Sequence, residues 1–529
     1  MRVRLVGTGT WAPGPPGTGR YPDRVLSYEE LTAPERDVWD AFPEGRPVDL
    51  RPHRSDDDSG PAGDESGAGA GAGEEPWGPE RTVRAPVVAA LLLGGHPGQP
   101  GSVPALRLAG ARISGRLDLG GAEIAHTIRF EECRFEEDIS FHGASTRTIT
   151  IARSRLRGID AGMVRVEGRL SVRSSVLRGR LSLMNAQVTG ELILSGAHLS
   201  APGDWALFAG GLVMGGAVFC RGGFTADGGL RLLGAQLSGG LFMERARCHN
   251  PGDAALLADN ATIATLVCSQ GFTARGAVRL RGATISGRLT LDGAVLDGGD
   301  TALDCARMHA DDLVLTPAVP PSGAVDLRGA RVTALHDRRG AWPDTVRLQG
   351  FVYGDLHGDD DAGREAVGHR LAWIRREPGY APQPYEQLAG WYRQIGHDDD
   401  ARRVLLAKQR HRRRTLRPAG RAWGHLLDGT VGYGYRPWLA GVWLAALALL
   451  GTGVFGAHTP VAAQPGEGAP FSALVYTLDL LIPIGGLGQR NAWYWTGGAP
   501  AWLAYALIAA GWVLTTAVVA GVTRTLNKN

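Results

Sequence analysis

An 11-residue pattern recurs in degraded form over about 250 residues of this chain, and such internal repeats constrain a fold more than any other feature. Apolar residues stand at offsets 0, +2 and +7 of each unit. Side chains two residues apart lie on one face of a β-strand, whereas a helix would space them by three and four. The clearest units are Leu106/Leu108/Ile113, Leu117/Leu119/Ile124, Ile128/Phe130/Phe135, Leu170/Val172/Leu177, Leu181/Leu183/Val188, Leu192/Leu194/Leu199 and Leu289/Leu291/Leu296.

A Gly-Ala dipeptide follows the paired apolar residues in many units, as at Gly121-Ala122 and Gly282-Ala283. Glycine permits a sharp corner, and alanine is small enough to lie inside one. These corners explain why the chain contains as many as 77 glycines. A longer period is also present, because Gly-Asp-x-Ala-Leu begins at Gly203, Gly252 and Gly299. We interpret it as a recurrent insertion in a repeat of several coils.

The fold class predicted is mainly β, a parallel β-helix (β-solenoid) over residues 105–358. A single coil cannot bury its inward side chains, but stacked coils can. We expect a short N-terminal helical segment over 1–51, with Thr32 and Glu35 forming a capping box. Residues 52–81 are acidic and glycine-rich, which predicts a disordered linker. Residues 82–104 are expected to form a cap helix over the first coil.

Residues 364–436 predict a helical hairpin, similar to one tetratricopeptide unit, and then a basic juxtamembrane segment. Tyr385, Leu388, Tyr392 and Ile395 share one helical face. We expect this hairpin to be a packing adaptor rather than a peptide groove. Basic residues near a membrane attract anionic lipids, so the lipid-contact residues predicted are Arg410, Arg412, Arg413, Arg414 and Arg417.

Residues 437–529 predict a membrane domain with two transmembrane helices, over Pro437–Val454 and Pro500–Val522. Each apolar run has about the 20 residues that a spanning helix needs. Arginines and lysines flank the pair of spans, while the segment 456–499 between them contains few charges. The positive-inside rule therefore predicts a multi-pass protein of the cell membrane with both termini and the solenoid in the cytoplasm.

The stretch from Phe471 to Gly488 is too short to span the membrane and predicts a re-entrant or interfacial helix. The membrane-loop candidates are Tyr476, Asp479, Gln489 and Arg490. One interpretation is a pore module, with Asp479 facing water beside a glycine-rich turn. The favoured interpretation is a hairpin that packs against the spans, with Asp479 at headgroup level or paired to Arg490. In that case Asp479→Asn leaves stability unchanged.

No motif amounts to an active site, and the catalytic residues and cofactors stay unknown. The five cysteines lack any zinc-ligand spacing, so no metal is predicted, and we expect buried thiols in a reducing compartment. The net charge of +3 gives no global bias toward nucleic acid. The acidic residues Glu131, Glu132, Glu136 and Glu137 predict a solvated face.

The layout from Leu31 to the C-terminus, including Gly511–Gly521, resembles actinobacterial membrane-anchored β-helix proteins that are loosely pentapeptide-repeat-like and often labelled "membrane-associated oxidoreductase". The resemblance implies redox chemistry, although no residues that carry it are evident. Three functions are therefore open: a membrane-anchored cytosolic scaffold or sensor with a protein partner on the solenoid, an oxidoreductase, or a two-span pore-loop channel. Membrane lipids are the other expected partners, and the transmembrane helices could support an oligomer.

Overall fold

The computed structural model describes residues 27–52, 77–96, 101–358, 363–418, 421, 425, 438–464, 470–482 and 486–526. The predicted linker therefore lies largely outside the described residues, as does most of the basic segment after residue 418. The chain divides into two compact units, Met1–Asp359 and Asp360–Asn529. Each unit is described by itself.

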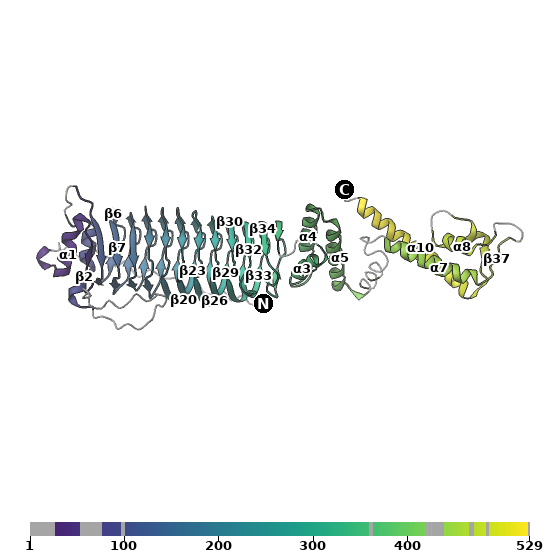
Figure 1. Ribbon diagram of the computed structural model, residues 1–529, viewed down its shortest axis with the longest axis horizontal. Coiled ribbons are helices and arrows are strands. Elements are labelled where there is room, and N and C mark those ends of the chain that lie inside the picture. The colour runs from purple at the N-terminus through teal and green to yellow at the C-terminus, as the bar shows by residue number, and fades with distance from the viewer. Residues whose placement is uncertain are drawn as a thin grey trace, which may run out of the picture. The chain divides into compact units, whose positions relative to one another are not determined.

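The first unit is a parallel β-solenoid of about 12 turns, which confirms the predicted fold (Figure 1). One stack of strands forms a 20-stranded sheet. Its members are β1 (Val48–Asp49), β3 (Ala105–Ala109), β6 (Glu123–Ile124), β7 (Thr127–Glu131), β10 (Ser145–Thr146), β11 (Ile149–Ala152), β14 (Arg165–Val166), β15 (Leu170–Ser171), β18 (Gln187–Val188), β19 (Leu192–Ile193), β21 (Val213–Met214), β22 (Val218–Phe219), β24 (Gln236–Leu237), β25 (Leu241–Phe242), β27 (Thr262–Ile263), β28 (Leu266–Val267), β30 (Thr284–Thr290), β32 (His309–Leu315), β34 (Arg331–Asp337) and β36 (Val352–His357).

The second stack forms a 16-stranded sheet. Its members are β2 (Thr82–Arg84), β4 (Arg112–Ser114), β5 (Leu117–Asp118), β8 (Arg134–Phe135), β9 (Ile139–Ser140), β12 (Arg155–Leu156), β13 (Ile159–Asp160), β16 (Val176–Leu177), β17 (Leu181–Ser182), β20 (His198–Phe208), β23 (Thr225–Arg231), β26 (Arg247–Leu257), β29 (Thr273–Arg279), β31 (Val295–Asp304), β33 (Ser322–Asp326) and β35 (Val346–Arg347).

One coil contains two of the 11-residue units. Leu170 pairs in register with Leu192 of the next coil, whereas Leu181 lies in the other sheet and pairs with Leu207. Successive units therefore direct their paired apolar residues into the core from alternate sheets. Leu183, for example, is fully buried. The repeat is thus half a coil.

A corner with left-handed backbone recurs about every 11 residues, that is twice per coil, and positive φ favours glycine or asparagine there. Gly121, Asn185 and Gly282 hold this position with φ of 67°, 53° and 63°. The alanines that follow them include Ala186 and Ala283, which are both fully buried. The Gly-Ala dipeptides therefore mark corners whose alanine faces inward, as predicted.

The longer period corresponds to a bulge in every second coil. In β20 the register to β23 shifts between Ser200 and Trp205, so residues 201–204 protrude from the ladder. Gly203 has a φ of 76° there, and Gly252 and Gly299 repeat the conformation. The short coil between bulges brings a glycine beneath each one, since a side chain on Gly228 would collide with the carbonyl oxygen of Ala201.

The N-terminal end of the solenoid is covered by helices α1 (Ala33–Ala41) and α2 (Ala85–Leu92) (Figure 1). The short 3-10 segments Tyr28–Glu30, Phe42–Glu44 and Pro79–Arg81 flank these elements. α2 packs against β2 and β5. The strands β1 and β2 pair with β3 and β4, so both sheets begin before residue 105. The sequence does not show these first strands, because β1 and β2 have only two and three residues, too few to display the repeat.

An ion pair between the buried Glu35 and the partly exposed Arg84 fixes α1 to β2. The Glu35 carboxylate is fully buried and accepts hydrogen bonds from Arg84 Nη2 at 2.7 Å and Arg84 N at 2.9 Å. It also accepts one from Thr32 N at 3.0 Å, which completes the predicted capping box. Burial alone would raise the pKa of Glu35, but the hydrogen bonds from Arg84 and Thr32 prevail and lower it below 4.5.

The second unit begins with α3 (Arg364–Ile374), α4 (Gln383–Gln394) and α5 (Asp398–Thr415). α4 and α5 pack against each other through the buried residues Tyr385, Leu388, Tyr392, Val404 and Leu405. Ile395 is exposed, because it follows the last residue of α4. The remaining elements are α7 (Trp438–Gly456), α8 (Ala473–Leu481), α9 (Gln489–Ala492), α10 (Gly498–Leu526) and the antiparallel pair β37 (Val461–Ala462) and β38 (Trp493–Tyr494).

One described helix is long and apolar enough to cross a membrane. This is α10, over the 19 residues Gly498–Thr516. The apolar stretch found in α7, Gly441–Gly456, is shorter. The second predicted span and the topology stay predictions.

We expect Leu183→Asp to destabilise the solenoid by several kcal/mol, because it buries an unpaired charge in the core. The neighbouring Met184 is 41% exposed, so Met184→Asp is a matched control and should change stability little. Thermal unfolding followed by circular dichroism measures both. Equal melting temperatures for the two variants would show that the assigned inward register is wrong.

We expect Glu35→Gln to destabilise the cap by about 1–3 kcal/mol at neutral pH, because Arg84 loses its charged acceptor. Since the folded pKa of Glu35 is lowered, its contribution is complete above the unfolded pKa near 4.5 and declines as the pH falls below that value. The melting temperatures of wild type and variant should therefore differ at pH 7 and differ less at pH 3.5. Glu29→Gln, at an exposed position nearby, should show no difference at either pH.

Candidate functional site

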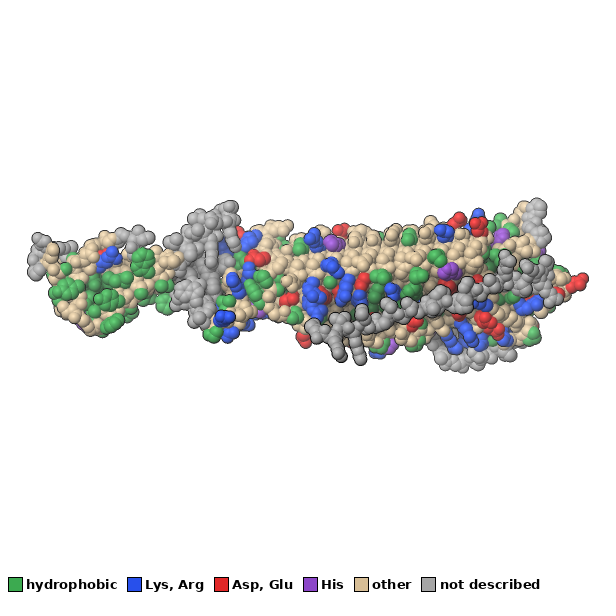
Figure 2. All heavy atoms as spheres, turned by 180° about the vertical axis from the view of Figure 1, so that it is seen from behind, with side chains coloured by type: hydrophobic (Ala, Val, Ile, Leu, Met, Phe, Trp, Pro, Cys, Tyr) green, Lys and Arg blue, Asp and Glu red, His purple; other side chains and the backbone are tan. Residues whose placement is uncertain are grey.

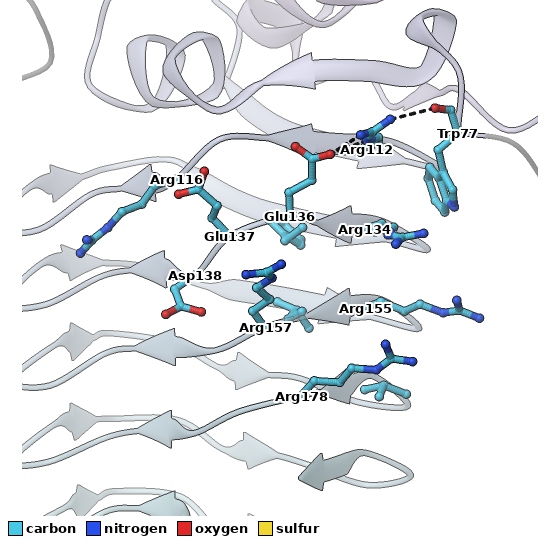
Figure 3. A pocket seen from close by; sticks show the side chains of 13 residues that line it. Trp77, Arg112, Arg116, Arg134, Glu136, Glu137, Asp138, Arg155, Arg157 and Arg178 are labelled. Carbon is cyan, nitrogen blue, oxygen red and sulfur yellow. Dashed lines mark hydrogen bonds and ion pairs between the residues drawn. The ribbon is translucent and has the colours of Figure 1, made fainter. Parts of the chain in front are cut away.

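A groove of ≈ 950 Å³ lies along one edge of the N-terminal coils (Figure 3). We call it the arginine groove. Six arginines and three acidic residues line it, so the lining has an excess of positive charge. The lining residues are Trp77, Arg112, Arg116, Arg134, Phe135, Glu136, Glu137, Asp138, Arg155, Leu156, Arg157, Val176 and Arg178.

Strand register explains why the arginines form a column. Arg112, Arg134 and Arg155 occupy the same position in β4, β8 and β12, and pair in register. Neighbouring strands in a sheet are about 4.8 Å apart. The residues after them, Ile113, Phe135 and Leu156, point inward and are buried. Alternation along each short strand thus turns these guanidinium groups outward.

The first arginine of the column is neutralised by its neighbours. Arg112 Nε donates to Glu136 Oε1 at 2.7 Å, and Nη1 donates to the backbone oxygen of Trp77 at 3.1 Å. Arg116 lies 4.0 Å from Asp118, which is too far for a strong pair. Charge at this end of the groove is therefore largely balanced.

Four charged side chains in the groove make no hydrogen bond or ion pair with any other described residue. They are Arg157, Arg178, Glu137 and Asp138, and all four are exposed. In Figure 3 the carboxylates of Glu137 and Asp138 lie to one side of Arg157, and Arg178 lies to its other side. The lining residues include no serine, threonine, cysteine, lysine or histidine. The arrangement is therefore suited to binding a charged ligand rather than to nucleophilic chemistry.

A second, smaller groove of ≈ 590 Å³ lies against the long strands of the bulged coils. His198 Nδ1 lies 2.5 Å from Thr225 Oγ1, and His198 Nε2 lies 3.5 Å from Asp227 Oδ2. Register brings them together, since His198 pairs with Thr225 and Ser200 with Asp227. The histidine is oriented by both neighbours.

The membrane-loop candidates Tyr476, Asp479 and Gln489 are brought together, but in a structural role. Asp479 was expected at headgroup level or paired with Arg490, and its partner at Arg490 is the backbone amide. Its carboxylate is fully buried and accepts hydrogen bonds from Leu487 N at 2.7 Å and Arg490 N at 2.8 Å. The Arg490 side chain itself is exposed. Backbone amides at the start of α9 satisfy the charge that the guanidinium was expected to satisfy.

Two further candidates support the same loop. Gln489 donates from Nε2 to Pro470 O at 3.1 Å, and its Oε1 accepts from Ser472 N at 3.4 Å. Tyr476 packs edge-on against Phe455, with ring centroids 5.1 Å apart. α8 therefore turns its polar residues inward, against α7 and α10, while Leu474 and Ile482 are exposed.

The predicted lipid-contact arginines lie at and beyond the C-terminal end of α5. Arg410, Arg412, Arg414 and Arg417 are exposed, and Arg413 is half-buried. Their charge suits the C-terminal end of a helix, where the backbone dipole is negative. They do not belong to the arginine groove, which lies in the other compact unit.

All five cysteines are buried free thiols, as expected. Burial raises the pKa of Cys133 and of Cys248 to about 12. It also raises the pKa of Cys220, Cys268 and Cys305 above the usual range. Because the thiolate is the reactive form, these residues are core side chains rather than redox-active groups. No group of three or more metal-ligating side chains is found within the described part of the chain.

Sequence reasoning missed both grooves. A signal for the arginine groove was present, since Arg112, Arg134 and Arg155 recur at coil spacing immediately before inward apolar residues. Finding it requires the coil length, which the 11-residue period does not reveal. Comparison of this chain with protein-family models, curated proteins and solved structures finds no match.

We expect Asp479→Asn to lower the stability of the helical module by about 1–3 kcal/mol, because the two backbone amides that bind the buried carboxylate lose a charged acceptor. Arg490→Gln is the matched control: it keeps the backbone amide and should melt like wild type. Thermal unfolding in detergent, followed by tryptophan fluorescence, distinguishes the two. If only Arg490→Gln destabilised the module, or if Asp479→Asn abolished an ion flux in bilayers, the structural role would be wrong.

Proposed function

We propose that this protein is a membrane-anchored scaffold whose solenoid presents the arginine groove to a charged partner in the cytosol. The deciding observation is the distribution of apolar side chains in the module formed by α7–α10. Leu449 is 75% exposed, Trp502 76% and Trp512 58%. Figure 2 shows hydrophobic side chains over much of the face of this module.

The polar groups of the same module are buried instead. Thr477 and Asp479 are fully buried and Gln489 nearly so. A water-soluble domain arranges its residues the other way round, because burying apolar surface drives its folding. In the hydrocarbon of a bilayer, exposed apolar side chains carry no such cost, while polar groups need partners inside the protein. Apolar residues outside and satisfied polar residues inside therefore support insertion of this module in a bilayer.

Helix length supports α10 as a spanning segment. In the proposal α7 forms the second span. The bonds of Asp479 and Gln489 hold α8 to the segment around α9, and α8 packs against both α7 and α10. Two spans would put the exposed arginines of α5 on the same side of the bilayer as the C-terminus, in keeping with the positive-inside rule. They would contact anionic headgroups, each contributing about 1 kcal/mol near the surface.

The solenoid supports the scaffold half of the proposal. Stacked coils provide a rigid surface on which outward residues can vary without affecting the core. The arginine groove contains charged side chains with no internal role, in a lining without nucleophiles. A partner of complementary charge would satisfy them.

We expect the full-length protein to stay in the membrane pellet after alkaline carbonate extraction. In intact cells, a membrane-impermeant maleimide should label Glu467→Cys, at a position outside the described residues. The matched variant Arg165→Cys, on the exposed face of β14, should label only after lysis. The five native cysteines do not interfere, because they are buried. Release by carbonate, or labelling of both positions alike, would contradict the proposal.

A further inference from the structure

The four unpartnered charges of the arginine groove indicate what its ligand carries. Arg157 and Arg178 follow β12 and β16, which pair in register through Leu156 and Leu177. Arg178 N donates to Leu156 O at 3.0 Å, so the two arginines lie on directly adjacent coils. Their backbones are separated by the strand spacing of about 4.8 Å. Neither guanidinium has a carboxylate partner among the described residues.

Two arginines on adjacent coils can direct their guanidinium groups to one phosphoryl group. Guanidinium is planar and presents several N–H donors in a fork, which matches the oxygens of phosphate with charge-assisted hydrogen bonds. A phosphate monoester carries up to two negative charges, and two arginines neutralise it. Arg155, which lies in β12 two residues before Arg157, adds a third positive charge to the lining.

The carboxylates at the other side of the groove require a different group. Glu137 and Asp138 lie in the loop between β8 and β9 and have no described partner. An ionised carboxylate only accepts hydrogen bonds. It would repel phosphate and would accept from hydroxyls, as acidic residues do from the ribose in dinucleotide-binding folds. The groove is therefore polarised, with acceptors at one side and donors at the other.

We propose that the arginine groove binds a phosphorylated polyol. The phosphoryl group contacts Arg157 and Arg178, and the hydroxyls donate to Glu137 and Asp138. A cavity of ≈ 950 Å³ has room for such a ligand. The chemistry is shared by a soluble sugar phosphate and by an inositol phosphate headgroup of a lipid. The proposal deepens the proposed function by naming the ligand class of the surface that the scaffold presents.

Calorimetric titration of the full-length protein in phosphatidylcholine nanodiscs tests the proposal, with inorganic phosphate and ribose 5-phosphate as probes. We expect wild type to bind both, and ribose 5-phosphate more tightly. Arg157→Gln/Arg178→Gln should weaken both probes by at least about tenfold, because charge-assisted hydrogen bonds are lost. Asp138→Asn should weaken ribose 5-phosphate several-fold and leave inorganic phosphate unweakened.

The matched control is Arg107→Gln/Arg165→Gln, which removes the same charge from exposed positions of β3 and β14 in the other sheet. It should bind both probes within about twofold of wild type, since distant surface charges are screened by salt. Equal weakening in the control pair would reduce the effect to net charge and overturn the proposal. Absence of ribose 5-phosphate binding by wild type, in nanodiscs with or without phosphoinositide, would also overturn it.

A second set of nanodiscs that contain phosphatidylinositol 4-phosphate distinguishes the two sources. If the headgroup occupies the groove, these nanodiscs should weaken ribose 5-phosphate binding to wild type, and Arg157→Gln/Arg178→Gln should abolish that competition. Unchanged binding identifies a soluble ligand. These readouts are independent of carbonate extraction, so failure of phosphate binding and failure of membrane anchoring are distinguishable.

Discussion

The backbone ladder between successive coils is the interaction on which the solenoid depends. At each corner a left-handed residue donates its amide to the next coil, as Gly121 N does to His142 O at 2.7 Å and Asn185 N to Gly210 O at 2.9 Å. No coil can satisfy its backbone alone, so each one requires the coil that follows. The same requirement explains why β1, β2 and α2 cover the first coil. Stability therefore comes from stacking and inward packing.

This arrangement separates folding from function within each strand. Inward residues such as Phe135 and Leu156 are constrained by packing in the core, whereas their neighbours Arg134 and Arg155 face outward. The residue type of the outward column is thus not set by the packing of the core. The helical module differs, because Asp479 is buried beside an apolar cluster that includes Phe455 and Tyr476, while Leu449 and Trp502 are exposed.

The inward residues of the solenoid could be predicted because a strand's period of two assigns them directly. Leu181 and Leu183 needed no knowledge of how the coil closes. The coil length could not be predicted, because an 11-residue repeat fits both a whole coil and half of one. Without that length, Arg112, Arg134 and Arg155 do not appear as a column, and the groove stays hidden. His198 and Thr225 are 27 residues apart and meet only through register.

The role of Asp479 could not be predicted either, for a different reason. The sequence shows which charged side chains are nearby, and Arg490 was the obvious partner. It does not show where backbone amides point, and these are what bind the carboxylate. A buried acid beside a glycine-containing turn can be satisfied by the turn itself. Side-chain pairing from sequence alone overlooks that alternative.

The bulged coils make the solenoid adjustable in length. The block that begins at Gly203 repeats at Gly252 and Gly299, and each block contributes two coils. Removing one block, with its bulge and the glycine beneath it, would join coils of the same register and shorten the stack by about 10 Å. The arginine groove lies in earlier coils and would be unaltered. Duplication of such blocks therefore provides a means by which the distance from the groove to the last coil could change in evolution while the groove itself stays intact.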